Sequence, residues 1–161
     1  MKQIQVEPLT LESFSPYGAF ADMLSPKGVS IGQNPVIFFR DMLECPLDGK
    51  AASLSCCVVT PRPLIIDEAE EHSHTAEVTL PLDGDIIIFV GEATPEDIPE
   101  DRLRIFYVPS GTAVVIKPGI WHGAPFPAKQ QTVHALVVLP QRTYTNDCVV
   151  KTLSAPVTVQ Q

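Results

Sequence analysis

Short apolar runs, separated by turn residues, make up most of the chain beyond residue 35. The runs are rich in β-branched and aromatic residues and recur at intervals of about 8 to 15 residues, which is typical of a β-sandwich or barrel. The strands predicted in this way are Val36 to Leu43, Ala52 to Val59, Leu64 to Glu70, Glu77 to Leu80, Asp85 to Val90, Leu103 to Val108, Thr112 to Ile116, Val133 to Leu139 and Cys148 to Leu153. Between two of them, Leu82-Asp83-Gly84 predicts a tight hairpin, because Asp-Gly tolerates the positive φ angles that such turns require.

Helices have little room in this pattern. The 16 prolines are spread through the whole chain, and a proline inside a helix removes a hydrogen bond and clashes with the preceding turn. One short helix is predicted near the start, where Thr10 caps Leu11 to Phe14 before Pro16 and Gly18 end it. No helices alternate with the strands, so a parallel βαβ sheet is excluded. We expect one all-β domain over residues 1–161, with the acidic stretch Glu92 to Asp101 as an exposed loop.

Composition narrows the partners and the location. The net charge is −8 with 11 basic residues, which are scattered, so nucleic acid and anionic membranes are not expected partners. No apolar run approaches the roughly 18 to 20 residues of a membrane helix. Residues 1–7 alternate polar and apolar side chains and lack the apolar core of a signal peptide, so we expect a cytoplasmic protein. The four cysteines show no CxxC spacing and are predicted to be free, mostly buried thiols.

Three of the four histidines fall in two segments, residues 70–84 and 111–123, and their spacing points to a metal site. Residues two apart in a strand share a face, so Glu70, His72 and His74 are expected to project to one side. A second strand ending at His122 can bring another imidazole opposite them. Imidazoles and carboxylates suit zinc, iron, manganese or nickel, so a divalent transition metal of unspecified identity is the predicted cofactor.

Other side chains are weaker candidates. Lys117 and Arg40 are cations that suit the carboxylate of a small anionic substrate, and Trp121 beside His122 is a candidate wall of the same pocket. Surface positions for the two cations and a core position for Trp121 are the alternatives. His134 lies within an apolar run, and a structural role is expected for it.

The two histidine segments resemble the paired motifs of the cupin superfamily, HxHx(3-4)Ex(6)G and Gx(5)PxGxxH. Reading back from Gly84, Glu77 stands at the six-residue gap, and the ligand frame then falls on His72 and Glu70. The resemblance implies a double-stranded β-helix, a jelly-roll-like barrel. It also implies a metal-ligand set of Glu70, His72, Glu77 and His122, with His74 as a rim residue or an alternative ligand.

The chain as a whole is similar to the ureidoglycolate lyase family. The similarity is carried by IQVEPLTLESFSPYG at 4–18, by Phe39-Arg40-Asp41, by the ExHxxxxE segment ending at Gly84, by LRIF at 103–106, by Trp121-His122 and by Asn146-Asp147-Cys148. The resemblance implies cleavage of ureidoglycolate to glyoxylate and urea by a homodimer. Glu77, Glu70 or His74 is the candidate base in that reaction, with Lys117 as a further catalytic candidate and with Arg40 and Trp121 binding the substrate.

Two positions depart from the pattern of the family. Members with lyase activity tend to carry Gln where this chain has Glu77, and a second His where it has Gly123. Two alternatives therefore stay open at this stage: another cupin isomerase, epimerase or decarboxylase acting on a small carboxylic or sugar acid, and a binding protein without catalysis. For the homodimer, an amino-terminal strand such as Gln3 to Val6 is a candidate for pairing with the sheet edge of a partner.

Overall fold

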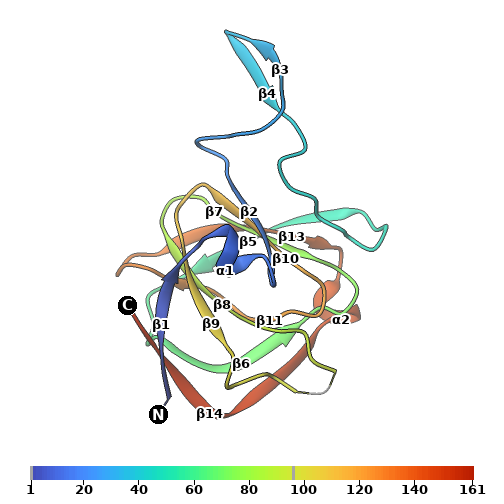
Figure 1. Cartoon of the computed structure of the whole chain (residues 1–161). Helices are drawn as coiled ribbons and strands as arrows, with labels where there is room; N and C mark the ends of the chain where they lie inside the picture. Colours follow the sequence, from blue (N-terminus) through green and yellow to red (C-terminus); the bar gives the residue numbers. More distant parts are fainter. Residues whose placement is uncertain (1, 96) are drawn as a thin grey trace.

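Strands arranged in two large sheets make up the body of the molecule in a computed structural model, which describes residues 2–95 and 97–161 (Figure 1). The first sheet has the order β11-β6-β14-β1-β9-β8-β12, and the second has the order β2-β10-β7-β13-β5. The elements are β1 Lys2–Pro8, α1 Leu11–Phe14, β2 Gly18–Asp22, β3 Ser30–Gln33, β4 Val36–Phe39, β5 Ala52–Val59, β6 Ile65–Glu71, β7 Glu77–Pro81, β8 Ile86–Gly91, β9 Arg104–Val108, β10 Thr112–Ile116, β11 Trp121–His122, β12 Phe126–Pro127, β13 Val133–Pro140, α2 Thr143–Asn146 and β14 Val149–Gln160.

The short strand β11 closes the first sheet on itself, because it pairs with β6 on one side and with β8 on the other. Side-chain alternation along β8 then separates two apolar clusters. Ile86, Ile88 and Val90 belong to the first cluster, whereas Ile87 and Phe89 belong to the second. Closure leaves β11 without a free edge and fixes His122 between two neighbouring strands.

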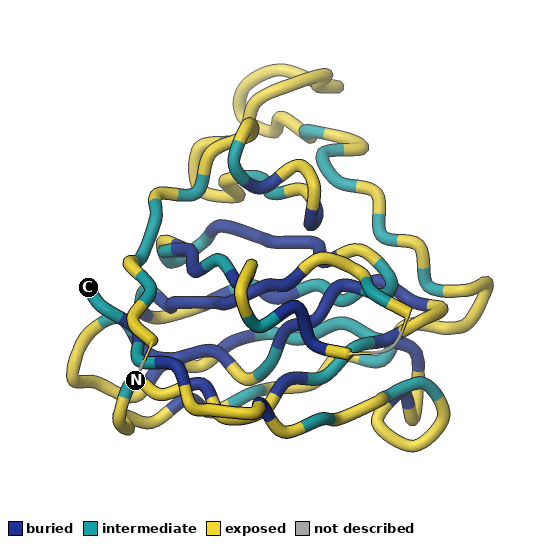
Figure 2. The backbone as a smooth tube through the Cα atoms, turned by 60° about the horizontal axis from the view of Figure 1, so that its bottom comes forward, coloured by how far each residue is buried: buried dark blue, intermediate teal, exposed yellow. Residues whose placement is uncertain are grey.

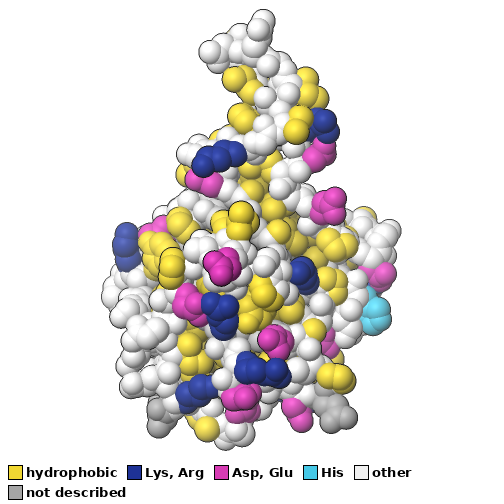
Figure 3. Space-filling model, in the orientation of Figure 1, with side chains coloured by type: hydrophobic (Ala, Val, Ile, Leu, Met, Phe, Trp, Pro, Cys, Tyr) yellow, Lys and Arg dark blue, Asp and Glu magenta, His cyan; other side chains and the backbone are white. Residues whose placement is uncertain are grey.

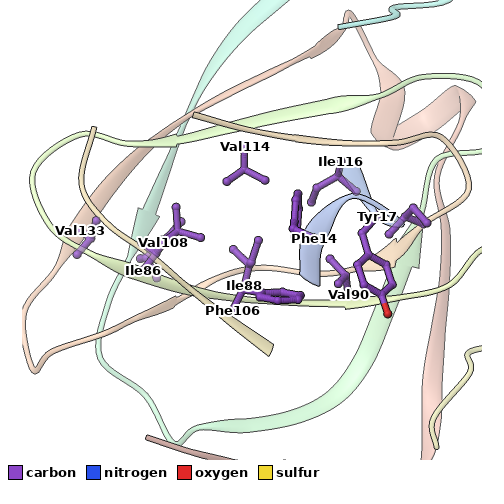
Figure 4. Packing of buried hydrophobic residues seen from close by; sticks show 12 residues of the cluster. Phe14, Tyr17, Ile86, Ile88, Val90, Phe106, Val108, Val114, Ile116 and Val133 are labelled. Atoms are coloured by element: carbon purple, nitrogen blue, oxygen red, sulfur yellow. The ribbon is translucent and has the colours of Figure 1, made fainter. Parts of the chain in front are cut away.

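The first cluster fills the space between the two sheets (Figure 4). Phe14 of α1 packs edge-to-face on Phe106 of β9, with 5.3 Å between the ring centroids. The helix that presents Phe14 begins as predicted, since Thr10 Oγ1 accepts a hydrogen bond from the backbone N–H of Ser13 at 3.1 Å. Buried segments form the layers of the barrel, and exposed ones lie around it and above it (Figure 2).

The predicted all-β barrel with a short amino-terminal helix is confirmed, although several strand limits were wrong. The expected strand Cys148 to Leu153 is the beginning of β14, which continues to Gln160. The strands β2 and β3 were not predicted, and β1 was expected as a strand that pairs with a partner. β1 pairs in parallel with both β14 and β9 of the same chain, so Gln3 to Val6 is not a free edge for a partner, contrary to expectation.

A projecting arm, residues 23–51, leaves the barrel after β2 and returns to it at β5 (Figure 1). It carries the hairpin of β3 and β4, which form a separate two-stranded sheet. The predicted strand Val36 to Leu43 therefore ends at Phe39 and lies outside the barrel. Its apolar side chains are exposed, so the apolar pattern identified a strand without identifying its sheet.

Asp85 holds the turn between β9 and β10 against the start of β8. Its carboxylate accepts hydrogen bonds from the Tyr107 hydroxyl and from the backbone N–H of Ser110, and Lys129 Nζ lies 3.5 Å away. The bond from Tyr107, followed by that from Ser110, keeps the pKa of Asp85 below its usual value. A carboxylate with a lowered pKa stabilises the fold above its unfolded pKa, and this stabilisation is lost as the pH falls through the folded value.

Asp85→Asn is therefore expected to lower the free energy of unfolding by about 1.5–3 kcal/mol at neutral pH, the usual range for hydrogen bonds to a charged group. The difference from the parent protein is expected to shrink at acid pH, as the pH falls through the lowered pKa of Asp85 and the carboxylate becomes protonated. Urea denaturation at both pH values measures it. A difference that stays constant with pH would show that the charge of Asp85 contributes nothing.

No helix among residues 2–95 and 97–161 is long and apolar enough to cross a membrane.

Candidate metal centre and its surroundings

Strand pairing places His122 and Glu70 on the same side of the first sheet. His122 stands opposite Glu70 of β6 and opposite Val90 of β8, and Val90 is buried in the cluster between the sheets. Directly paired residues share a face, so the His122 and Glu70 side chains point to the interior of the barrel. Trp121, one residue earlier, points the other way into the second cluster.

His72 reaches the same place from the loop after β6, and Glu77 reaches it from the first position of β7. His72 follows Glu70 by two residues, and Glu77 begins β7, where it pairs with Ile116 of the first cluster. The two imidazoles are almost fully buried, at 4% exposure for His72 and 3% for His122. Their ring centroids are 5.1 Å apart, with 70° between the ring planes. The residues that the spacing grouped together therefore lie close together in the structure, and their role as metal ligands stays a prediction.

Backbone carbonyls fix the orientation of both imidazoles. His72 Nδ1 donates to the carbonyl oxygen of Asp147 at 2.7 Å, and His122 Nδ1 donates to that of Ile120 at 2.8 Å. Because a carbonyl oxygen can only accept, each Nδ1 carries the proton, and Nε2 presents its lone pair when the ring is neutral. A hydrogen bond of this kind on the far nitrogen is usual for histidines that bind metals.

The Glu77 carboxylate lies between the two inward-facing nitrogens. Its Oε2 is 3.4 Å from His72 Nε2 and 3.4 Å from His122 Nε2, while Oε1 accepts a hydrogen bond from the Thr79 hydroxyl at 2.9 Å. Burial raises the pKa of Glu77, but His122 and His72 outweigh it and bring that pKa well below its usual range. Burial likewise lowers the pKa of His122, and Glu77 more than offsets this and raises it to about 8. The Glu77 carboxylate therefore stays negatively charged beside the two imidazoles.

The donor set fits a divalent metal ion. One carboxylate oxygen of Glu70 and one nitrogen each of His72 and His122 all lie within 4.8 Å of one another. Nε2 of both histidines is buried and has no hydrogen-bond partner among the residues that the structure describes. Unsatisfied buried polar atoms are rare in proteins because they cost free energy. Two such nitrogens, aimed at one point beside two carboxylates, match the coordination chemistry of zinc, iron, manganese or nickel.

Cys148 contacts this site from the start of the last strand. Its Sγ donates to Glu70 Oε2 at 3.3 Å. Burial, followed by the neighbouring Glu70 carboxylate, raises the pKa of Cys148 to about 12, so the thiol stays protonated. All four cysteines are free thiols, as predicted, but the expectation that most are buried was wrong, because Cys56 is exposed and the other three are partly exposed.

Asp147 ties the loop of His72 to the segment before β14. Its carboxylate accepts from the backbone N–H groups of Ser73 and His74, both at 3.0 Å, and lies 2.9 Å from His74 Nδ1. The hydrogen bond to Asp147 raises the pKa of His74. The His74 side chain is itself exposed, so it lies at the rim, as one of the two alternatives expected.

Three further candidate residues do not meet at this site. Lys117 Nζ donates to the carbonyl oxygen of Ser15 at 2.6 Å, which anchors it to the end of α1 rather than to a substrate. Arg40 pairs with Asp41 at 2.5 Å on the projecting arm. The Trp121 ring is buried in the second cluster, and its Nε1 donates to Thr94 Oγ1 at 3.0 Å. It is therefore a core aromatic and does not line the space between the imidazoles.

Arg62 is the cation that sequence reasoning missed. A cavity of about 350 Å³ is lined by residues that include Arg62, Phe89 and Glu70, and Glu70 is the member of the metal-ligand set among its described lining residues. Arg62 Nη2 donates to the carbonyl oxygen of Ala124 at 3.0 Å, and its guanidinium carbon lies 4.2 Å from the centre of the Phe126 ring. These contacts hold the guanidinium at the cavity wall. The only signal in the sequence was a lone arginine between Pro61 and Pro63.

Gly123 also lines this cavity. A Cβ atom at this position would lie 2.7 Å from Phe89 Cζ, closer than real contacts allow. The Phe89 ring thus occupies the space that a side chain at position 123 would need. A histidine at position 123 would therefore require Phe89 to move. The glycine at this position goes together with the position of the Phe89 ring.

Comparison with known proteins places this geometry in a family. The family model described as ureidoglycolate lyase matches residues 1–160. The chain belongs to the ureidoglycolate lyase family. This is an enzyme family, and the matched span contains every residue of the site.

Two relatives from the ureidoglycolate lyase family show the extent of the likeness. The ureidoglycolate lyase of Rhodobacter capsulatus is 31% identical over 140 residues, which cover 85% of this chain and 86% of the relative. That of Pseudomonas savastanoi pv. phaseolicola is 28% identical over 127 residues, covering 76% and 74%. Among solved structures, a dTDP sugar isomerase from Desulfovibrio desulfuricans G20 matches with a TM-score of 0.57 at 15% identity, over 87% of this chain and 88% of that one. This last likeness supports the cupin fold.

Proposed function

We propose that this member of the ureidoglycolate lyase family cleaves ureidoglycolate to glyoxylate and urea, assisted by a divalent transition metal. The observation that carries the proposal is the pair of buried, unpartnered Nε2 atoms of His72 and His122, which face two carboxylates. The family model that matches residues 1–160 supports ureidoglycolate as the substrate. Glu70, His72, Glu77 and His122 would hold the ion.

The reaction moves one proton from the hydroxyl of ureidoglycolate to the urea nitrogen as the bond between carbon and nitrogen breaks. A bound divalent cation would supply Lewis acidity, which makes the hydroxyl of the substrate more acidic. The protein must then accept that proton and return it to the departing urea. One carboxylate can do both, so no further reactant is required.

We propose Glu70 as the proton carrier. Glu77 is less free for this role, because one of its oxygens accepts from Thr79 and the other lies against both imidazoles. Glu70 lines the cavity of about 350 Å³ and also lies within ligand distance of the histidines. Glu70 is thus the candidate ligand that also lines this cavity, where the substrate would bind. Glu77 then provides a fixed negative charge at the centre of the site.

Arg62→Ala is expected to raise the KM for ureidoglycolate about tenfold while changing kcat less. The guanidinium at the cavity wall is placed to bind the carboxylate of the substrate, and hydrogen bonds between charged partners contribute about 1.5–3 kcal/mol. Steady-state kinetics measure the two constants, with Arg40→Ala on the arm as the matched control. An unchanged KM for Arg62→Ala would show that another group binds the substrate carboxylate.

The direct test is glyoxylate release by the purified protein. The protein is loaded in turn with nickel, manganese, iron and zinc, bound metal is counted by elemental analysis, and each enantiomer of ureidoglycolate is supplied separately. The spontaneous decay of each enantiomer in buffer is subtracted. Metal-dependent release from one enantiomer supports the proposal. Protein that carries stoichiometric metal but releases no glyoxylate from either enantiomer would overturn it.

The expectation of a cytoplasmic homodimer stays a prediction. The chain has a net charge of −8. A small anionic substrate can still bind to it through a single cation such as Arg62. The identity of the metal follows from the loading experiment.

A further inference from the structure

The two carboxylates of the metal-ligand set are held in different ways. Glu77 has partners for both of its oxygens, since Oε1 accepts from Thr79 and Oε2 lies against both imidazoles. Glu70 instead accepts a hydrogen bond from a thiol, with 3.3 Å between Cys148 Sγ and Glu70 Oε2. An ionised carboxylate can only accept, so the thiol is the donor. The orientation of the Glu70 carboxylate therefore depends on Cys148.

The start of β14 brings Cys148 to Glu70, although the two residues are 78 positions apart in the sequence. Val150 of β14 pairs directly with Glu70 of β6 and lines the same cavity. Cys148 stands two residues before Val150, the spacing at which side chains of an extended chain share a face. The carbonyl oxygen of the preceding residue, Asp147, accepts from His72 Nδ1. Two consecutive residues thus each contact one member of the metal-ligand set.

The donor to Glu70 is uncharged, unlike the partners of several carboxylates on the surface. Arg102, for example, pairs with Glu92 at 2.9 Å, and Figure 3 shows Lys and Arg side chains beside Asp and Glu on the face in view. A neighbouring cation stabilises the charged form of a carboxylate and makes it a weaker base. A thiol can direct the carboxylate without adding charge, which suits a group that must accept a proton and release it again.

We propose that Cys148 is a positioning residue that acts through Glu70, its thiol fixing the plane of the carboxylate so that the second oxygen faces the reacting atoms. The proposal rests on the proposed function, in which Glu70 carries the proton. The buried Nε2 atoms of His72 and His122, which have no partner in the described part of the chain, show independently that this carboxylate faces a binding site. Misplacement of a reacting group by about 1 Å can cost a hundredfold in rate.

Three substitutions at position 148 separate the hydrogen bond from packing. Cys148→Ser keeps a donor, Cys148→Val fills the space of the thiol without a donor, and Cys148→Ala removes both the donor and the volume. Cys45→Ala is the matched control, because Cys45 is also a partly exposed free thiol and lies on the projecting arm. Thermal melting verifies that each variant is folded.

Cys148→Val and Cys148→Ala are expected to lower kcat for metal-dependent glyoxylate release about tenfold, which corresponds to about 1.4 kcal/mol of activation free energy. KM is expected to change little, because Arg62 is proposed to bind the substrate carboxylate. Competition with a chelator is expected to show metal affinity lowered about tenfold in the same two variants. Cys148→Ser and the control are expected to keep most of both properties. The opposite order, with the valine variant intact and the serine variant impaired, would indicate packing and overturn the proposal.

The contact itself is tested without catalysis, by the infrared S–H stretching band, which moves to lower frequency when a thiol donates a hydrogen bond. The difference spectrum between the parent protein and Cys148→Ala isolates the band of Cys148. Glu70→Ala is expected to shift this band towards that of a free thiol, and an unshifted band would overturn the proposal. Absence of glyoxylate release from the metal-loaded parent would overturn the proposed reaction alone, since the infrared band and the metal affinity still decide whether Cys148 positions Glu70.

Discussion

Replacing both His72 and His122 with alanine is expected to abolish stoichiometric metal binding and to lower metal-dependent glyoxylate release at least about a hundredfold. The loss of a single hydrogen-bond partner of a metal ligand usually costs 10–100-fold in affinity or activity, and this change removes two ligands outright. Elemental analysis after loading and dialysis measures the metal, and single-turnover assays measure the product. Both imidazoles are buried, so a thermal melt accompanies the assays.

The fourth histidine provides a matched control for this variant. His134 is half-exposed and lies 2.6 Å from the Asp83 carboxylate, at the turn before β8, so His134→Ala should keep both metal and activity. Stoichiometric metal in the double variant would show that the metal binds at other residues. Loss of metal with full retention of glyoxylate release would leave the cavity as an acid-base pocket that works without an ion.

Asp147→Ala is expected to weaken metal affinity about 10–100-fold while leaving all four candidate ligands in place. The carboxylate holds the backbone of Ser73 and His74, and the carbonyl of the same residue accepts from His72 Nδ1. Without the carboxylate, the loop of His72 and the segment before β14 are no longer tied together, so the imidazole loses its fixed direction. Competition with a chelator gives the dissociation constant directly.

Asp83→Ala offers a control of the same chemistry at a different place. Asp83 accepts from the backbone N–H of His134 at 2.7 Å and contacts His134 Nδ1, much as Asp147 does with His74. The Asp83 variant is expected to change metal affinity little. Equal losses in the two variants would indicate general destabilisation, and an unchanged affinity in Asp147→Ala would show that the carboxylate does not position His72.

Local spacing was sufficient to predict which side chains meet at the metal-ligand set. Glu70 and His72 share a face because they stand two apart at the end of a strand, and the frame that ends at Gly84 located Glu77. His122 joins them because β11 pairs with β6 at Glu70. The barrel and its capped first helix followed from the same local signals, namely period-two runs and a threonine before an apolar turn. The predicted hairpin at Leu82-Asp83-Gly84 was wrong, because it joins β7 and β8, which belong to different sheets.

Tertiary contacts determine the positions of the other candidate side chains, which spacing in the sequence could not predict. Trp121 and His122 are adjacent, so alternation sends one into the second cluster when the other enters the site. Long cations such as Lys117 and Arg40 find partners wherever the chain brings acceptors within reach, and here these are Ser15 and Asp41. Arg62 lines the cavity only because Ala124 and Phe126 arrive from a distant part of the sequence.

The run Val36 to Leu43 shows another limit. Alternation and β-branching predict a strand, but they do not state which sheet it joins. In the barrel strands the apolar side chains are buried within the same chain, whereas on the arm they are exposed. The sequence pattern is the same in both settings, because alternation indicates a strand and does not indicate what covers its apolar face.

Both imidazoles of the metal-ligand set are oriented by carbonyl oxygens of the main chain, at Asp147 and Ile120. A carbonyl group is common to every amino acid, so no substitution at position 147 or 120 deletes the acceptor itself. Substitutions of the side chains around the site therefore leave in place the groups that set the two tautomers. The course of the backbone alone keeps the same two nitrogens directed at one point.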